Sequence, residues 1–516
     1  MTPPPADDRL PTGFRVRLDR RVRVLDGGAV LVGGAPPRLV HLAAAARRLL
    51  AGGELVVADA TSAALARRLV DGGIAHPALD RDVRLAGRGC PTRATGMSDS
   101  RDGDVRLAGD VTVVVPVRDR ADGLRRLLGA LPDGLGGIVV VDDGSADAGA
   151  VRAVAQAAGA RVLRHDAPRG PAASRNAGAA TATTPLVAFL DSDVVPEPGW
   201  LEVLLAHFAD PAVALAAPRI VALAPVTGAL GRYEAVRSSL DLGPDPALIV
   251  PRTRVAYVPS AALLVRREAL GGADRWGFDE RLHVAEDVDL VLRLHAAGWR
   301  LRYDPAARVA HDHRTTLRAW WARKAFYGTG AAPLALRHAG SVPPMVLSPW
   351  SAAVSALLLT ASPRAVLAAV AVGAVTAERL ARSLGAGPPH PAPSRAVAPR
   401  ALRRPRATAA LLVGLGASGA VGQTVDAVTR HYWPLAALAC LFSRRARRTV
   451  ATVALAEGVA DWWRCDRRDR PPLAVHVVAR RLDDLAYGAG LWWGALRLRT
   501  IAPLLPASSR TRFGGG

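Results

Sequence analysis

The sequence is poor in lysine and in aromatic residues, and both shortages argue against a nucleic-acid-binding protein. Of its 67 basic residues, Lys324 is the only lysine. The formal net charge of +22 would ordinarily suggest an anionic partner. However, aromatic residues make up only 5% of the chain and are not interleaved with the arginine runs, so the stacking positions that bind bases are missing. We therefore expect no nucleic-acid partner.

Cysteine is also scarce. Cys90, Cys440 and Cys465 are three in number, far apart and without a CxxC pair, which argues against a disulfide framework or a zinc site and fits a reducing compartment. The first ten residues are polar and proline-rich, without the apolar core of a signal peptide. We expect the catalytic part of the chain to act in the cytoplasm.

The chain is instead rich in apolar residues and long enough for several domains. Half of its 516 residues are hydrophobic, and the mean hydropathy is +0.16. At about 100–200 residues a domain, the length allows roughly two to four domains. Changes in composition predict a small N-terminal domain over residues 14–80, a linker rich in Gly, Asp, Arg and Ser over 81–110, an α/β domain over 111–335 and an apolar helical region over 342–505.

The N-terminal domain is predicted to be α+β. Its β-like runs are at 14–18, 21–24 and 29–32, and Asp26-Gly27-Gly28 is a hairpin turn. Two helices rich in Ala, Leu and Arg follow at 42–50 and 62–70, and Ser62 stands at a plausible helix cap.

In the central region strands and helices alternate. Continuous apolar runs, typical of strands buried on both faces, occur at 111–117, 138–141, 161–163 and 186–190, with helical patterns between them at 124–131, 151–157 and 172–180. Further strands are predicted at 255–265 and 301–303, and an amphipathic helix at 288–296. This repetition predicts a mostly parallel, Rossmann-like sheet with helices on both faces and ligands at the carboxyl ends of its strands.

The C-terminal region is apolar and punctuated by arginine clusters. Residues 407–425 just reach the length of a membrane-spanning helix, but several glycines make them weakly hydrophobic. We expect this region to associate with the cytoplasmic face of the cell membrane; the alternative is a soluble helical domain in the cytoplasm. Its GxGxxG match at 414–419 has no acidic residue about 20 positions further on, so we interpret these glycines as helix-packing residues.

Carboxylates follow two of the predicted strands. Asp142 and Asp143 follow the strand at 138–141, while Asp191 and Asp193 follow the strand at 186–190. Both pairs therefore lie at the expected ligand edge of the sheet. Carboxylate oxygens suit Mg²⁺ or Mn²⁺, which bridge readily to a diphosphate. A polar turn alone would also explain an Asp-Ser-Asp sequence.

A third acidic group, Glu286 and Asp287, opens the helix predicted at 288–296. Acidic residues at a helix N-terminus are often only caps. In combination with Pro116 and the three segments at 142–145, 175–178 and 191–193, however, the order and spacing resemble those of the family 2 glycosyltransferases. The resemblance covers the central region and implies a GT-A fold.

The resemblance also implies a role for each matching residue. Asp287 would be the catalytic base, with Glu286 beside it positioning the acceptor. Asp193 would bind a divalent metal at the diphosphate, with Asp191 near the ribose or the metal and His311 or His313 as a further ligand. The residues implied in donor binding are Pro116, Arg118, Asp142, Asp143, Arg175, Asn176 and Asp191.

The implied chemistry is an inverting displacement. A positioned carboxylate removes the proton of an acceptor hydroxyl as that oxygen attacks the anomeric carbon, and the metal neutralises the charge of the departing nucleoside diphosphate. A single displacement converts an α-linked donor into a β-linked product. UDP-glucose is the expected donor.

A narrower resemblance concerns the whole chain. The three-part architecture and the segments at 320–324, 327–330 and 482–488 are similar to the glycosyltransferases of the mycofactocin system. This likeness implies β-linked glucose on premycofactocin, a peptide-derived redox cofactor precursor. The N-terminal domain would then be similar to winged-helix domains that dock a precursor peptide along a β-edge; it could equally be a structural cap.

Two other functions fit parts of the sequence. A membrane polysaccharide or glycolipid synthase of the same superfamily would use the apolar tail as a channel, but the tail lacks several strong spans and a Gln-x-x-Arg-Trp motif. A catalytically inactive scaffold for peptides or lipids would be expected to have lost at least one of Asp191, Asp193, Glu286 and Asp287, and all four are present.

Overall fold

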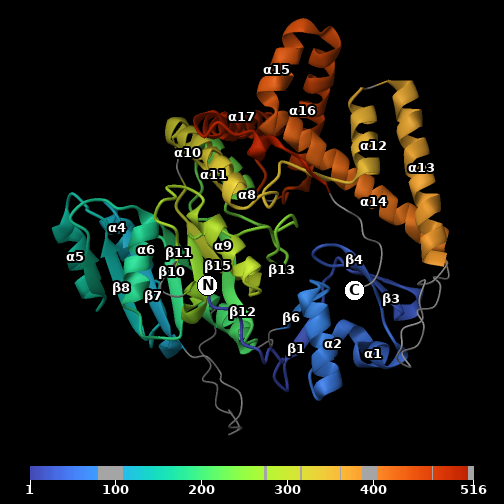
Figure 1. The fold of residues 1–516 in the computed structure, drawn as a ribbon. Helices are drawn as coiled ribbons and strands as arrows, with labels where there is room; N and C mark the ends of the chain where they lie inside the picture. Colours follow the sequence, from blue (N-terminus) through green and yellow to red (C-terminus); the bar gives the residue numbers. More distant parts are fainter. Residues whose placement is uncertain are drawn as a thin grey trace. The chain divides into compact units, whose positions relative to one another are not determined.

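The computed structural model describes residues 1–78, 108–271, 276–313, 316–360, 362–385, 404–467 and 469–508. Within it the chain forms two compact units, one made of residues 1–227 and 237–313 and the other of 228–236 and 314–516 (Figure 1). Most of the predicted linker, and Cys90, lie outside the described residues.

The N-terminal part of the first unit contains two three-stranded antiparallel sheets, β5-β1-β6 and β2-β3-β4. Its elements are β1 (Arg15–Leu18), β2 (Arg23–Leu25), β3 (Val30–Gly33), β4 (Arg38–His41), α1 (Ala44–Leu49), β5 (Glu54–Val56), α2 (Ala60–Asp71) and β6 (Ala75–Pro77). The predicted hairpin is confirmed, because β2 and β3 pair across the turn at 26–28. The sequence analysis missed β4, β5 and β6, since runs of three or four residues are too short to show alternation.

The predicted cap of α2 is corrected by the structure. Asp59 is the N-cap, and its carboxylate accepts the N–H of Ser62 at 2.7 Å. The Ser62 hydroxyl accepts the N–H of Asp59 at 2.9 Å in return. Ser62 is therefore the third helical residue of a capping box, and α2 begins two residues before the predicted start.

The rest of the first unit is built on a nine-stranded sheet in the order β11-β15-β12-β14-β10-β7-β8-β9, with β13 paired to β15. Strands β10, β7, β8 and β9 are parallel, as predicted, whereas β14 is antiparallel to both neighbours. The strands are β7 (Val111–Val117), β8 (Gly137–Asp142), β9 (Arg161–Arg164), β10 (Leu186–Leu190), β11 (Val194–Pro196), β12 (Val213–Ala222), β13 (Ala247–Leu248), β14 (Ala262–Arg266) and β15 (Arg300–His311).

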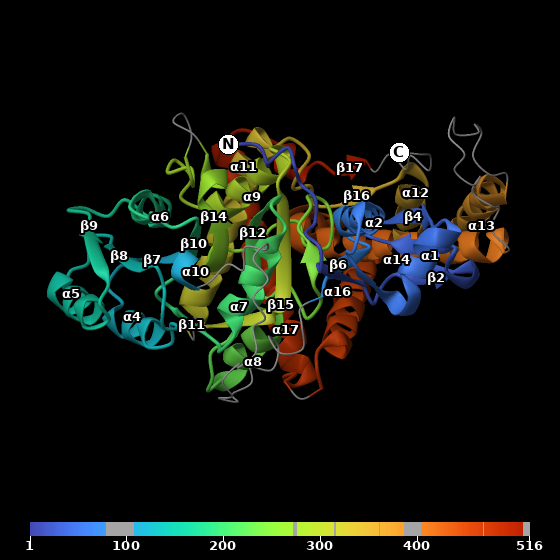
Figure 2. The ribbon, with the colours of Figure 1, turned by 90° about the horizontal axis from the view of Figure 1, so that it is seen from below.

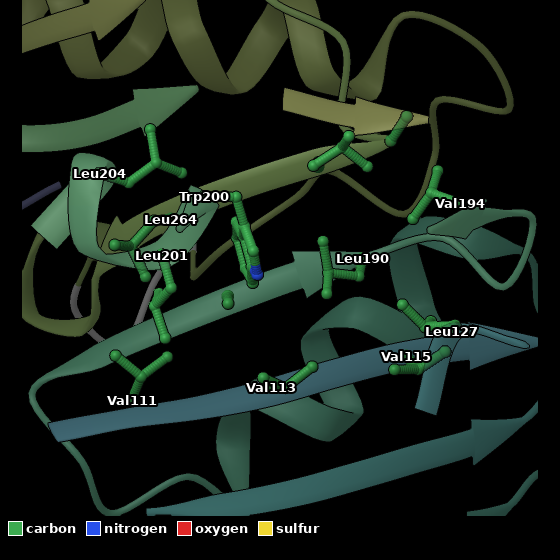
Figure 3. Close-up of a cluster of buried hydrophobic side chains, with 14 of the residues drawn as sticks. Val111, Val113, Val115, Leu127, Leu190, Val194, Trp200, Leu201, Leu204 and Leu264 are labelled. Atoms are coloured by element: carbon green, nitrogen blue, oxygen red, sulfur yellow. The ribbon is translucent and has the colours of Figure 1, made fainter. Parts of the chain in front are cut away.

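Side chains of the central strands alternate between two hydrophobic cores. In β7, Val111, Val113 and Val115 face one core, which Figure 3 shows together with Leu190 and Trp200. Val114 faces the opposite core. The sheet is thus buried on both faces, which explains why these strands are continuously apolar in sequence.

Helices cover both faces of this sheet. Figure 2 shows α4 and α5 on one side of β7, β8 and β9, and α6 on the other. The helices are α4 (Ala121–Leu128), α5 (Ala148–Ala157), α6 (Pro171–Ala180), α7 (Trp200–Leu205) and α9 (Glu286–Ala296). Predicted helices at 124–131, 151–157, 172–180 and 288–296 are therefore confirmed, with ends shifted by a few residues.

Two predicted strands are corrected. The strand expected over 255–265 covers only Ala262–Arg266, because Pro259 has no N–H to donate to a neighbouring strand. The short strand expected over 301–303 is twelve residues long and ends at His311. His311 is therefore paired in the sheet, opposite Val194 of β11.

Charged side chains join the N-terminal part to the large sheet domain within the first unit. Arg67 of α2 contacts both carboxylate oxygens of Asp210 at 2.7 and 2.8 Å. Arg300 of β15 contacts Asp71 at 2.7 Å and Asp8 at 2.9 Å. Because both arginines are largely buried, these bidentate pairs fix the orientation of the two parts more firmly than exposed ion pairs would.

The second unit is helical. It consists of α8 (Gly228–Arg237), α10 (Leu317–Thr329), α11 (Ala331–Arg337), α12 (Pro349–Leu359), α13 (Pro363–Gly385), α14 (Pro405–Asp426), α15 (Trp433–Phe442), α16 (Arg444–Arg464) and α17 (Leu473–Arg497), with a short parallel pair of β16 (Val346–Leu347) and β17 (Ala507–Ser508). Helices α10 and α11 belong to this unit, although the sequence analysis extended the sheet domain to residue 335.

Helices α10 and α17 pack closely enough that their facing glycines cannot be replaced. A Cβ on Gly328 would lie 2.1 Å from the carbonyl oxygen of Tyr487, and one on Gly490 would lie 1.8 Å from that of Ala325. The only lysine of the chain, Lys324, is buried beside them and contacts Glu234 at 2.9 Å and Asp483 at 3.2 Å. The apolar tail therefore contains a buried polar network.

One helical segment among the described residues, Pro405–His431, is long and apolar enough to cross a membrane by length and composition. It includes α14, and 22% of its most apolar stretch is buried. A core helix of a soluble protein passes the same test, so this finding alone does not decide between the two alternatives.

The contact between α6 and β7 yields a first prediction. A Cβ on Gly178 would lie 2.3 Å from a methyl carbon of Val114 in the core. Gly178→Ala should therefore destabilise the protein by about 1–3 kcal/mol through overpacking. Gly149→Ala, on the exposed start of α5, is the matched control and should be neutral or stabilising. Thermal unfolding measures both; equal melting temperatures for the two variants would contradict the proposed close approach.

Candidate active site

The first two predicted donor-binding loops follow β7 and β8. Pro116 pairs with Val141 in the parallel ladder, and Arg118 is exposed just beyond it. Asp142 ends β8 and is almost fully buried. Its carboxylate accepts the N–H of Ser145 at 2.9 Å and pairs with Arg164 of β9. Asp142 therefore holds the turn after its strand in place.

Asp143 is buried as the anchor of a second loop. Its carboxylate accepts hydrogen bonds at 2.8 Å from the Nδ1 of His165 and from the backbone N–H groups of Arg169 and Gly170. Burial by itself would raise the pKa of Asp143, but these hydrogen bonds outweigh it and hold the pKa below its usual value. An ionised Asp143 thus connects β8 to the loop that leads into α6.

Arg175 is the most connected residue of the site. It projects from α6, is only 2% exposed, and donates to Asp191 at 2.6 Å and to Glu286 at 3.0 Å. Its guanidinium also lies over the ring of Phe278, 5.3 Å from the centroid. Desolvation opposes its charge, yet Asp191 and Glu286 raise the pKa of Arg175 well above its usual value. Asp191 follows a strand and Glu286 begins a helix, and the guanidinium of Arg175 thus holds these two carboxylates together.

Asn176, the next residue, contacts backbone rather than facing solvent. Its side-chain oxygen accepts the N–H of Phe278 at 2.9 Å, and its side-chain nitrogen donates to the Phe278 carbonyl at 2.8 Å and to Glu280 at 3.1 Å. Gly277, the residue before Phe278, has a φ of 67°, in the left-handed region that favours glycine. A Cβ there would lie 2.2 Å from the Asn176 oxygen, so the pair requires glycine.

Asp287 lies at the start of α9 with its carboxylate held by backbone. Its oxygens accept the N–H of Ser260 at 3.0 Å and that of Val288 at 2.8 Å. Burial and the neighbouring charge of Glu286 raise the pKa of Asp287 to about 6, although the two hydrogen bonds and Arg175 oppose the shift. A carboxylate with its pKa near the working pH is suited to accept a proton in catalysis.

Asp193 is placed with a histidine, as the sequence analysis suggested. The Nε2 of His311 lies 3.6 Å from Asp193, and His313 is 3.1 Å from His311 between their Nδ1 atoms. Arg120 also contacts Asp193 at 3.3 Å. Asp191 instead contacts Arg175. The carboxylate of Asp193 is the kind of oxygen ligand that Mg²⁺ and Mn²⁺ prefer, so this residue could contribute to a metal site.

Several contacts of this site could not be found from the sequence. Arg120 contacts Asp193, Ser260 donates its N–H to Asp287, and the ring of Phe278 lies against Arg175, but no role was predicted for these three residues. Ser260 contributes only its backbone N–H, so the identity of its side chain gives no sign of this contact. Arg120 had a weak signal, because it follows the first strand within three residues.

One cysteine lies beside other side chains that could bind a metal. Cys465 is the residue that caps the C-terminus of α16, four residues after Asp461, and with His476 of α17 their ligand atoms are within 4.8 Å of one another. The Nε2 of His476 is hydrogen-bonded to Asp461 at 2.9 Å, which accounts for burial of this histidine without a metal.

Comparisons with known proteins identify the family of the chain. Residues 112–270 match the family model described as Glycosyl transferase family 2. The pre-mycofactocin glycosyltransferases of two Mycobacterium tuberculosis strains are each 47% identical to this chain over 506 residues, which is 96% of this chain and 98% of theirs. The succinoglycan biosynthesis protein ExoU of Rhizobium meliloti is 31% identical over 37% of this chain and 59% of its own.

Among solved structures, the mannosyltransferase PcManGT from Pyrobaculum calidifontis, in complex with GDP-Man and Mn²⁺, covers 70% of this chain and 91% of its own. The two share 21% sequence identity, with a TM-score of 0.34.

The raised pKa of Asp287 predicts the pH dependence of activity. A base must be ionised to accept a proton, so kcat/KM should rise with pH through about 6 and level off above it. In Glu286→Gln the neighbouring negative charge is lost, and this acidic limb should move to lower pH. Glu202→Gln, an exposed change of the same kind on α7, is the control. A limb that stays in place in Glu286→Gln would argue against the coupling.

Proposed function

This chain belongs to the pre-mycofactocin glycosyltransferases of glycosyltransferase family 2, and we propose that it transfers glucose from UDP-glucose to premycofactocin with inversion. As a family 2 glycosyltransferase it has a GT-A sheet domain, to which the carboxylates described above belong. The proposal specifies what the family leaves open, namely the sugar, the linkage and the residue that accepts the proton.

The observation that carries the proposal is the placement of Asp287. Its carboxylate combines a raised pKa with a fixed orientation, and Arg175 connects the adjacent Glu286 to Asp191. The base that we propose thus follows Glu286, which Arg175 connects to Asp191 after β10, and this placement supports an acceptor hydroxyl near the ligand edge of the sheet.

The donor diphosphate would lie at Asp193. Asp193, with His311 and Asp191, would hold a divalent metal, which when bound neutralises negative charge on the diphosphate. Arg120 contacts Asp193 in the structure and would face the same phosphates. Asp142 and Asp143, which shape the loops after β8, would surround the nucleoside.

The residues of the chain then support a single displacement. Asp287 accepts the proton of the acceptor hydroxyl while its oxygen forms a bond to the anomeric carbon of the sugar. The bond between that carbon and the diphosphate oxygen breaks on the opposite side, and the leaving group takes the electron pair. One displacement inverts the configuration, so an α-linked donor gives a β-linked product.

The N-terminal part supports a peptide-derived acceptor. In the sheet β2-β3-β4, strand β2 lies at an edge and exposes Val24. A peptide strand could pair with such an edge through its backbone, with an apolar side chain against Val24. We propose this edge as the place where the precursor peptide is held.

Two variants separate proton transfer from donor binding. Asp287→Asn keeps the shape but cannot accept the proton, so transfer should fall by at least about 100-fold while donor affinity stays near that of the wild type. Asp193→Ala should instead remove metal-dependent donor binding. Isothermal calorimetry with UDP and Mn²⁺, beside a transfer assay, measures both; loss of donor affinity in Asp287→Asn would contradict its assignment as the base.

The proposed reaction is tested with the purified protein, Mn²⁺, UDP-glucose and the premycofactocin precursor, analysed by mass spectrometry. Successive hexose additions are expected, and NMR of the product should show a β-linkage. Release of UDP with a lipid or glucan acceptor, but no addition to the precursor, would refute the acceptor and favour a glycolipid or polysaccharide synthase. EDTA should abolish the reaction, and full activity in EDTA would refute the metal.

A further inference from the structure

Helix α15 is apolar on all sides, yet none of its residues is buried. It covers Trp433–Phe442 and contains no charged residue. The side chains of its last two residues, Leu441 and Phe442, are 73% and 83% exposed. Leu438 and Leu435 are also exposed, about one and two helical turns earlier. Exposed apolar surface of this extent on a soluble protein usually marks a site of interaction.

An arginine cluster follows this apolar helix directly. After Ser443, which caps α16, the sequence Arg-Arg-Ala-Arg-Arg occupies residues 444–448, and all four arginines are exposed. Residues 427–456 contain no aspartate or glutamate. The turn between α15 and α16, which Figure 1 shows as a helical hairpin, therefore combines apolar side chains with uncompensated positive charge.

A second turn of similar character is attached to the first. Arg445 donates a hydrogen bond to the carbonyl of Thr360, at the end of α12. The first turns of α13 expose Leu367 at 71%, with Val370 and Arg364 beside it. The α12–α13 turn and the α15–α16 turn, which this hydrogen bond connects, thus both expose leucine and arginine side chains.

The length of an apolar helix decides whether it can span a bilayer. Ten residues of α-helix are about 15 Å long, roughly half of the hydrocarbon thickness. Helix α15 is therefore too short to span the bilayer. An apolar surface bordered by arginines is, however, suited to the boundary between headgroups and acyl chains.

We propose that the α12–α13 and α15–α16 turns dock the enzyme on the surface of an anionic phospholipid bilayer. Leu441, Phe442 and Leu367 enter the acyl boundary, and the arginines of residues 444–448 contact lipid phosphates. Charge complementarity selects this partner, because the surface holds positive charge without acidic residues to balance it.

The long helix α14 does not need to span the bilayer for this mode of binding. It packs against α12 and α13, and buries Ala409, Val413 and Ala420 within the second unit. At its far end, Asp426 pairs with the largely buried Arg480 at 2.7 Å. These contacts give α14 protein partners along its length, so docking rests on the exposed turns.

The test is flotation of the full-length protein with vesicles of phosphatidylcholine, alone or mixed with phosphatidylglycerol. Binding should require the anionic lipid. The double variant Leu441→Ser/Phe442→Ser should lower the affinity at least tenfold, because two large side chains no longer leave water. Arg444→Ala/Arg448→Ala should lower it about fivefold per arginine at low salt.

Matched controls use residues that are equally exposed elsewhere. Leu496→Ser on α17 and Arg47→Ala/Arg48→Ala on α1 should float as the wild type does. Circular dichroism establishes that each variant is folded. Equal binding to both vesicle types, or wild-type binding by either double variant, would overturn the proposal. Retention of the protein in cell membranes after alkaline carbonate extraction would overturn it in favour of a spanning helix.

Discussion

The charge of one buried arginine is the constraint on which the active site depends. Arg175 can be buried only because Asp191 and Glu286 compensate its charge, since an unpaired buried charge would be strongly destabilising. These partners come from the turn after β10 and from the start of α9. The pairing therefore fixes the distance between the turn after β10 and the start of α9, where Asp287, the base that we propose, follows Glu286.

The same physical rule shapes the second unit. Lys324, Arg430 and Arg480 are buried there among Glu234, Asp426, Asp483 and Asp484. Glycines at 328 and 490 let α10 and α17 approach closely enough to enclose this network. Packing and charge pairing thus account for the segments at 320–330 and 482–490, which distinguish the chain in sequence. The exposed apolar side chains and arginines lie elsewhere, on α13, α15 and α16.

The sequence analysis was most accurate where one physical signal dominates. Strand β7 is buried on both faces, so its apolar run defined both ends correctly. It was least accurate where structure depends on distant partners: β4, β5 and β6 are stabilised by strand pairing and have no pattern of their own. Pro259 argues against a strand over the whole of 255–265, because it has no N–H to donate to a neighbouring strand. The functional roles of all the predicted site residues stay predictions, both in donor and metal binding and in catalysis.

The sequence by itself determined the class of fold and the chemical groups of the site, because buried strands followed by carboxylates are local patterns. It also determined the family, through the order of those patterns along the chain. Only the tertiary structure decided which groups meet. Arg175 and Glu286 are 111 residues apart, and Ser260 acts on Asp287 through a backbone N–H that any residue except proline could supply. The pKa of Asp287 arises from burial and a neighbouring charge, and both are properties of the folded chain.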